Sequence, residues 1–261
     1  ITHMNNKIGD TTLSSYNYTY YLDGNQKSKT DHLSQVTAYE YDGLGRLKTE
    51  LEADINTQYT YDLSSNRIKK YISGTTPVET NYLYDANDRL IWEETETENN
   101  ILTATEYYYD ANGNQIGKLF NDLTDQTGAV AGISLELQPG TINYEYYEYD
   151  GFNRLTAYHT PITTAEYIYN TQGLRISKTV NGQETKHIWD GSNMVMELNG
   201  SNQVIDKYIR GNRLIKSDLN GYYLYNAHGD VIQLTDRQGA ITRSYLYDAF
   251  GIEQEVLPDD P

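Results

Sequence analysis

The residues with the clearest chemical potential are aspartates that recur at one position of a repeated pattern. Six of them directly follow a tyrosine: Asp42, Asp62, Asp85, Asp110, Asp150 and Asp248. Carboxylates of this kind could ligate a metal ion or act as general acids. Asn170 and Asn226 occupy the same position of the pattern, however, and an amide is not an acid. We therefore favour a turn role, in which the short side chain bonds to the backbone just ahead.

The sequence was also searched for metal, cofactor and catalytic motifs. Segment 110–114 matches the start of a calcium-binding EF-hand loop, but Gln115 stands where that loop requires glycine and Asn121 where it requires a bidentate glutamate. The five histidines lack zinc-binding spacing, and the chain has no cysteine. There is no P-loop, dinucleotide-binding or nucleophile-elbow motif. We predict no catalytic, cofactor-binding or metal-binding residue, and no enzyme activity.

The charge and the amino-acid composition limit which partners the chain is expected to bind. The formal net charge is -17, from 37 Asp and Glu against 20 Lys and Arg. Such a chain repels phosphate backbones and anionic lipid surfaces, so we expect neither nucleic acid nor membrane as a partner. No stretch is apolar enough to span a membrane. Tyrosine alone accounts for 27 residues, which favours a sheet whose aromatic rings pack while their hydroxyls reach an edge.

An internal repeat explains this abundance of tyrosine. Its unit is Tyr-x-Tyr followed by Asp or Asn, and most copies lie 20 to 25 residues apart. The aromatic pairs are Tyr39 and Tyr41, Tyr59 and Tyr61, Tyr82 and Tyr84, Tyr107 and Tyr109, Tyr147 and Tyr149, Tyr167 and Tyr169, Tyr223 and Tyr225, and Tyr245 and Tyr247, with His187 and Trp189 as a degenerate copy. Because side chains alternate along a strand, both rings of a pair are predicted on one face.

The position three residues past the Asp or Asn predicts a left-handed turn residue. It is occupied by Gly45, Ser65, Asp88, Gly113, Asn153, Gly173, Asn193, Gly229 and Gly251. All but one of these are Gly, Asn or Asp, the types that tolerate a positive φ. The chain then resumes as a strand, and pairs such as Asn181-Gly182 give a second turn before the next copy. We predict an all-β chain of tandem antiparallel β-hairpins without helices.

The motifs resemble the YD repeats of Rhs-family proteins. Tyr-Asp-Gly-Leu-Gly-Arg-Leu at 41–47 and Tyr-Asp-Ala-Asn-Gly-Asn at 109–114 are typical YD repeats, and residues 188–251 are similar to the Rhs-associated core region. The resemblance covers roughly residues 15 to 255. It implies a curved or spiralling sheet that forms part of a hollow shell, in a secreted or cell-surface bacterial protein. The implied partners are the rest of the parent polypeptide and its cargo, such as a toxin.

The resemblance also sets the expected organisation. Residues 1–4 resemble a cloning remnant, residues 5–185 form the hairpin array with an insertion near 121–141, and residues 186–261 form core-like repeats continuous with it. The core region normally ends in an Asp-Pro self-cleavage motif before the toxin. Asp260-Pro261 lacks the glycine-containing context of that motif, so we expect neither autoproteolysis nor a toxin in this chain. Any export signal is expected upstream.

Three functions remain open at this level. The first is a non-catalytic structural segment that encloses a toxin or spaces surface domains. The second is a binding module for carbohydrate or a surface partner, which would use exposed tyrosines or the 121–141 loop. The third, ranked last, is an enzyme. Self-association through an unpaired edge strand is a further expectation, because exposed strand edges pair readily.

Overall fold

The computed structural model describes residues 1–98, 101–122 and 143–254, and these residues form 22 strands and no helix. The predicted all-β class of tandem antiparallel hairpins is confirmed. The chain divides into two compact units, Tyr41–Glu184 and the pair of segments Ile1–Glu40 and Thr185–Pro261. Strands β4 and β16 each cross a boundary of these units by one or two residues. The expected insertion near 121–141 lies almost wholly outside the described residues.

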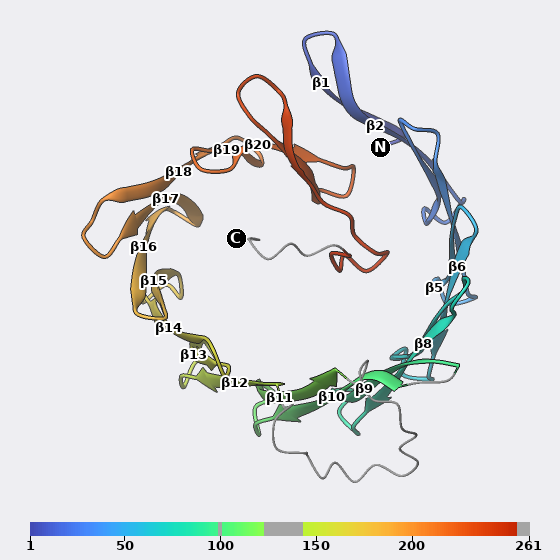
Figure 1. Ribbon diagram of the computed structural model, residues 1–261, viewed down its shortest axis with the longest axis horizontal. Helices are drawn as coiled ribbons and strands as arrows, with labels where there is room; N and C mark the ends of the chain where they lie inside the picture. The colour runs from blue at the N-terminus through green and yellow to red at the C-terminus, as the bar shows by residue number, and fades with distance from the viewer. Residues whose placement is uncertain (99–100, 123–142, 255–261) are drawn as a thin grey trace. The chain divides into compact units, whose positions relative to one another are not determined.

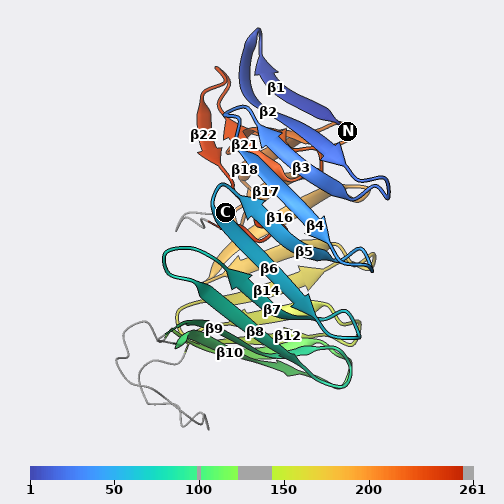
Figure 2. The same cartoon turned by 90° about the vertical axis from the view of Figure 1, so that its right-hand side faces the viewer.

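The unit of residues 41–184 is a run of antiparallel strands that pair in chain order. Its strands are β5 (Leu47–Glu52), β6 (Ile55–Tyr61), β7 (Arg67–Ile72), β8 (Val78–Tyr84), β9 (Leu90–Thr97), β10 (Ile101–Tyr109), β11 (Gln115–Asp122), β12 (Asn143–Tyr149), β13 (Leu155–His159), β14 (Thr164–Tyr169) and β15 (Arg175–Val180). Consecutive strands of this run are paired with each other, from β5 with β6 through β14 with β15. Figures 1 and 2 show these hairpins side by side.

The other unit joins the first hairpins of the chain to the last ones. Its strands are β1 (His3–Ile8), β2 (Thr11–Tyr20), β3 (Gln26–Asp31), β4 (Val36–Tyr41), β16 (Gln183–Asp190), β17 (Asn193–Asn199), β18 (Val204–Arg210), β19 (Leu214–Ser217), β20 (Gly221–Tyr225), β21 (Val231–Thr235) and β22 (Ile241–Ser244). The Asn6 side chain donates a hydrogen bond to the Tyr225 carbonyl at 3.1 Å. The Ala227 amide donates to the Tyr18 hydroxyl at 3.3 Å. These contacts link two segments more than 200 residues apart.

The two faces of the strands differ in burial, as the period of two predicts. Tyr39 and Tyr59, the first aromatic of their pairs, are 9% and 4% exposed. A small residue two positions earlier, Thr37 or Thr57, is buried on the same face. The residue between the two aromatics points the other way and is exposed, as Leu83 shows at 57%. The core is therefore a thin layer of tyrosine rings packed over small side chains.

In most motifs, a register shift lies immediately before the second aromatic residue. In the 41–184 unit it falls between Thr60 and Tyr61 and between Leu83 and Tyr84. The same shift occurs at the three later motifs of that unit. Such a bulge places one extra residue on the returning strand and increases local twist. The repeat pattern did not predict this shift.

The structure differs from the sequence prediction at two copies of the repeat. Asn193 begins β17 and does not have a positive φ, whereas Gly191 has a φ of 58° and makes that turn. Strand β16 extends through Asp190, so the reversal comes earlier than in the other copies. Tyr245 and Tyr247 lie beyond the end of β22, and Tyr247 makes an isolated bridge to Glu253.

Gly113→Val should destabilise the hairpin formed by β10 and β11. Gly113 has a φ of 88°, which costs a residue with a side chain about 1–2 kcal/mol. Nothing lies within 4 Å of a Cβ placed there, so the effect would come from the backbone and not from a clash. Gly151→Val is the control, because that turn glycine is equally open and lacks a positive φ. Thermal melts followed by circular dichroism should show a lower Tm for Gly113→Val only. Equal melting of both variants would contradict the assignment.

Candidate functional site: the ladder of aspartate turns

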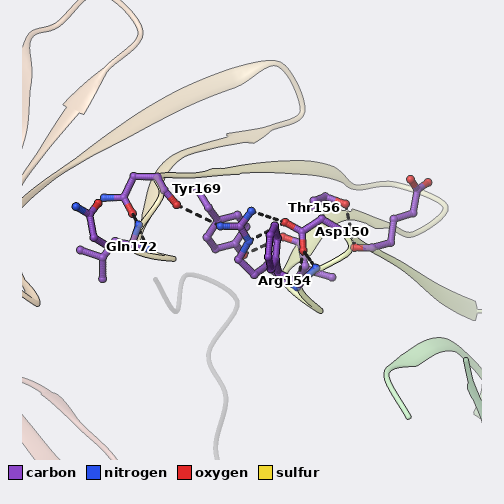
Figure 3. Close-up of polar contacts among 10 residues, drawn as sticks. Asp150, Arg154, Thr156, Tyr169 and Gln172 are labelled. Carbon is purple, nitrogen blue, oxygen red and sulfur yellow. Dashed lines mark hydrogen bonds and ion pairs between the residues drawn. The ribbon is translucent and has the colours of Figure 1, made fainter. Parts of the chain in front are cut away.

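Each motif turn is organised by one side-chain oxygen. In the turn after β12, Oδ1 of Asp150 accepts hydrogen bonds from the amides of Phe152 at 2.8 Å and Arg154 at 3.0 Å. The backbone closes the same loop, because the Asp150 amide donates to the Arg154 carbonyl and the Asn153 amide donates to the Asp150 carbonyl. Figure 3 shows this turn and the neighbouring one that contains Gln172. The carboxylate thus replaces the strand partner that the reversing backbone has lost.

The arrangement recurs in both units. A side-chain oxygen accepts the amides two and four residues ahead at Asp31, Asp42, Asp85, Asp110, Asp150, Asn170, Asn199, Asn226, Asp236 and Asp248. Asp62 accepts the amide of Asn66 in the same way. Positive φ values occur three residues past the acceptor at Gly45, Ser65, Asp88, Gly113, Asn153, Gly173, Gly229 and Gly251.

Arginine joins each turn to the next. Nε of Arg46 donates to Oδ2 of Asp42 at 2.6 Å, and its Nη1 donates to the carbonyl of Asp62, in the following turn, at 3.1 Å. Two further arginines four residues past an aspartate do the same: Arg89 reaches Asp110 at 3.3 Å and Arg154 reaches Asn170 at 3.2 Å. We call this chain of connected turns the turn ladder, and within the 41–184 unit it comprises the turns that begin at Asp42, Asp62, Asp85, Asp110, Asp150 and Asn170.

Asparagine takes the place of arginine at two positions of the turn ladder. The Asn66 side chain donates to Asp62 at 3.1 Å and to Asp88, in the next turn, at 2.8 Å. Asn114 likewise donates to Asp110 at 2.8 Å and to Asn153 at 2.9 Å. The link from one turn to the next therefore does not require a positive charge. It requires a side-chain donor four residues past the acceptor.

The second tyrosine of seven motifs completes the link between repeats. Its hydroxyl donates to a backbone carbonyl of the preceding hairpin, for example from Tyr169 to Leu155 at 2.8 Å. The other donors of this kind are Tyr61, Tyr84, Tyr109, Tyr149, Tyr225 and Tyr247. The turn-ladder arginine covers the same ring, and the guanidinium of Arg154 lies 5.2 Å from the Tyr169 ring centre. These tyrosines therefore hold neighbouring hairpins together.

The first aromatic of each motif has more varied surroundings. The hydroxyl of Tyr107 donates to Glu93 at 3.1 Å, and that of Tyr147 donates to Glu145. Arginines stack over Tyr82, Tyr167 and Tyr245 at 4.7, 5.3 and 5.0 Å. In the other unit, Tyr223 accepts a bond from Asn220. Trp189, the second aromatic of the degenerate copy, stands opposite Met194.

Hydrogen bonding lowers the pKa of the carboxyl groups of Asp42, Asp85, Asp110 and Asp150. For Asp85 and Asp150 the arginine side chain is the largest cause, followed by backbone amides. For Asp110 it is the Asn114 side chain, and for Asp42 it is the Arg46 amide. Each of these four carboxylates is thus stabilised in its ionised, accepting form. The four are poor proton donors, which argues against general-acid chemistry at these positions.

Among the described residues, no three His, Cys, Asp or Glu side chains are arranged to hold a metal ion. The segment 110–114 uses its carboxylate as a turn acceptor. No helix that could cross a membrane occurs in the part of the chain described. The chemical role of these side chains is to accept hydrogen bonds from the backbone amides of the turns.

Sequence reasoning missed two components of the turn ladder. The arginines and asparagines four residues past the acceptor were not predicted to have a role in the turns. Their recurrence at 46, 66, 89, 114 and 154 is a signal that could have identified them. Two further turns, at Asp31 and Asp236, were also missed because no Tyr-x-Tyr pair precedes them.

Comparison with known proteins now identifies the repeat. Residues 20–54 match the family model described as RHS Repeat. The tRNA3(Ser)-specific nuclease WapA of Bacillus spizizenii is 29% identical over 235 residues, which is 87% of this chain. The chain is thus similar to Rhs-family YD-repeat proteins. The tRNA(Glu)-specific nuclease WapA of Bacillus subtilis subsp. natto is 34% identical over 119 residues, 43% of this chain and 5% of that protein.

The chain spans only 8% of the length of the Bacillus spizizenii relative. Two solved structures are also similar to it. The crystal structure of TcdB2-TccC3-Cdc42 aligns with 93% of this chain and 15% of its own chain, at 14% identity and a TM-score of 0.45. The crystal structure of TcdB2-TccC3-TEV aligns with 96% and 16%, at 12% identity and a TM-score of 0.39.

Asp150→Ala should lower the Tm, whereas Asp150→Asn should have a much smaller effect. Alanine removes the acceptor of two backbone amides and the partner of Arg154, leaving polar groups unsatisfied. Asparagine retains the accepting oxygen, as Asn170 shows in the next turn. Thermal melts of the two variants test the difference. Equal losses would mean that the ion pair, and not the turn acceptor, stabilises the hairpin.

Stability should fall at both ends of the pH scale. Asp85 and Asp150 have a folded-state pKa below 3.8, so their stabilisation is present above pH 3.8 and is lost as the pH falls below it. Burial raises the pKa of Tyr84, Tyr109 and Tyr169 above 10.0, so their stabilisation is lost as the pH rises past 10.0. Tm measured against pH should fall on both sides, and tyrosinate absorbance should appear together with unfolding. A Tm that is constant well below pH 3.8 would contradict the acid arm.

Proposed function

We propose that this chain is a non-catalytic structural segment of a larger exported bacterial protein, and that it forms part of a β-shell around a toxin cargo. In this proposal residues 5–185 and 186–261 are parts of one repeat array. The observation that supports this proposal is that the side chains able to do chemistry are engaged in hydrogen bonds that hold the hairpins together. In the 41–184 unit, the motif aspartates and second tyrosines bond to neighbouring backbone, and the ladder arginines bridge successive turns.

A β-shell needs strand ends that do not fray and hairpins that stay in register. The turn ladder keeps the strand ends in place, because each turn is hydrogen-bonded to the next by a side-chain donor. The tyrosine hydroxyl bonds between hairpins keep the register, because each fixes one strand against a defined carbonyl of the previous repeat. Neither network depends on a bound ligand, which is what a passive container requires.

The named activity of the relatives supports a cargo role. They are named as tRNA nucleases, and the region similar to this chain is a small part of each. A segment with a net charge of -17 is a poor binder of tRNA, because it repels phosphates. We infer that any nuclease or other toxin activity belongs to a different part of the parent protein, and that the parent is secreted or held at the cell surface.

The glycan-binding alternative is weakened at the motif tyrosines. Seven second tyrosines have their hydroxyls bonded to backbone, and arginines lie over the rings of several. A sugar ring would have to displace these contacts before it could stack. The 121–141 loop lies almost wholly outside the described residues and adds no support.

Protease protection of the cargo in the full-length parent protein tests the proposal. Combined Asp85→Ala and Asp150→Ala substitutions should open the wall and speed cleavage of the cargo domain. The matched Asp85→Asn and Asp150→Asn protein should remain protected, because the turn acceptors remain. Cargo that is cleaved equally fast in the wild type and in both variants would overturn the enclosing role. Turnover of tRNA or polysaccharide by the isolated chain would overturn the non-catalytic one.

A further inference from the structure

The sheet face opposite the motif tyrosines carries a second set of aromatic residues. Tyr108 on β10 stands opposite Gly117 on β11, which in turn stands opposite Tyr146 on β12. A neighbouring row places Glu106, Leu119 and Tyr144 across the same three strands. Residues that are opposite each other in a sheet share a face, so both rows lie together on one surface. Figure 2 shows the strands that carry them.

These tyrosines are exposed, unlike their motif neighbours. Tyr108, Tyr144 and Tyr146 are 40%, 41% and 47% exposed, whereas Tyr107, Tyr147 and Tyr149 on the other face are only partly exposed. Tyr108 lies next to the glycine opposite it, because its Cβ and Cδ2 lie 3.6 Å from where a Cβ of Gly117 would be. A larger residue at position 117 would therefore contact the Tyr108 side chain.

The same face is acidic. Glu94 on β9 pairs with Ala104 and therefore shares a face with Glu106 and Tyr108, while Glu148 follows Tyr146 by two residues. Together Glu94, Glu106, Tyr108, Tyr144, Tyr146 and Glu148 define what we call the acidic aromatic face. No Lys or Arg lies on this face among the described residues of β9, β10, β11 and β12. The motif face of the same strands does contain one, Lys118, within 3.8 Å of Glu145.

The electrostatics of the face favour a cation. Burial, and then repulsion from Glu96, raises the pKa of Glu94. Burial, and then a hydrogen bond to Glu106, raises the pKa of Tyr108 to about 12. An incoming cation would relieve the repulsion between Glu94 and Glu96. Two basic residues lie near the face: the ring of His159 stacks on Tyr146, with 6.0 Å between ring centres, and lies 3.5 Å from Glu148, while Lys69 stands opposite Asn81, the partner of Glu94, and is paired with Glu79 at 2.6 Å.

We propose that the acidic aromatic face binds a basic polypeptide segment, with Arg or Lys side chains stacked on Tyr108, Tyr144 and Tyr146 and paired with Glu94, Glu106 and Glu148. Cation–π contact and charge-assisted hydrogen bonds are the interactions that this combination of rings and carboxylates offers. The net charge of -17 would also draw a basic partner toward the chain. A neutral sugar could stack on the rings but would leave the glutamates without a counter-ion. The inference rests on exposure and charge, and holds whether or not the chain forms a shell.

Binding of a fluorescent peptide of alternating Arg and Gly to the whole chain tests the aromatic part. Binding should be saturable. Combined Tyr144→Ala and Tyr146→Ala substitutions should weaken it by about fivefold to tenfold. Combined Tyr144→Phe and Tyr146→Phe should retain affinity within about twofold, because the stacking ring remains. The Phe variant also controls for folding, which circular dichroism of both proteins verifies. Equal weakening by Ala and Phe would contradict the stacking mode.

A charge-matched pair of triple variants tests the acidic part. Glu94→Gln, Glu106→Gln and Glu148→Gln together should weaken the peptide by about tenfold or more. Asp10→Asn, Asp54→Asn and Asp190→Asn change the net charge equally at exposed positions elsewhere, and should weaken it by about twofold or less. Equal losses in the two triples would show attraction by net charge alone and overturn the site. Tyrosine-dependent binding of neutral oligosaccharides without binding of the Arg peptide would also overturn it.

Discussion

The structure depends on a single side-chain oxygen that accepts two backbone amides at the end of a strand. A hairpin array must reverse direction every ten residues or so, and each reversal strips backbone amides of their strand partners. An Asp or Asn oxygen satisfies two of them at once, and a left-handed residue three positions later lets the chain return. The adjacent bulge and the placement of the second tyrosine follow from this geometry. Because the acceptor needs only an oxygen, aspartate and asparagine alternate freely at the position.

The turn ladder connects the individual hairpins into one continuous scaffold. A satisfied turn would hold one hairpin, but the donor four residues later also contacts the neighbouring turn, so that adjacent hairpins share their ends. The tyrosine hydroxyls repeat this connection across the strands. Stability in such an array is a sum of modest nearest-neighbour terms and not the product of one large core. The thin core of buried Tyr39, Tyr59 and small residues agrees with this.

Most of the fold could be predicted from the sequence, since its information is local. Two rings separated by one residue define a face, and a glycine or asparagine after an aspartate defines a turn. The prediction was wrong at Asn193, because β16 extends through Asp190 and Gly191 makes the reversal there. The arginine bridges were not predicted, since they depend on which turns are neighbours in space. The acidic aromatic face was missed for a related reason: Tyr108 and Tyr146 come together only through the pairing of β10, β11 and β12.

The direction of the links between hairpins bears on how such a chain is made. Arg46 reaches forward 16 residues to the Asp62 carbonyl, and the hydroxyl of Tyr61 reaches back 14 residues to Leu47. These bonds therefore link a hairpin to the repeats directly before and after it in the chain. Contacts of such short range form quickly and in chain order. A polypeptide built this way can acquire its structure vectorially, one repeat at a time, while the remainder is still emerging from a ribosome or a secretion channel.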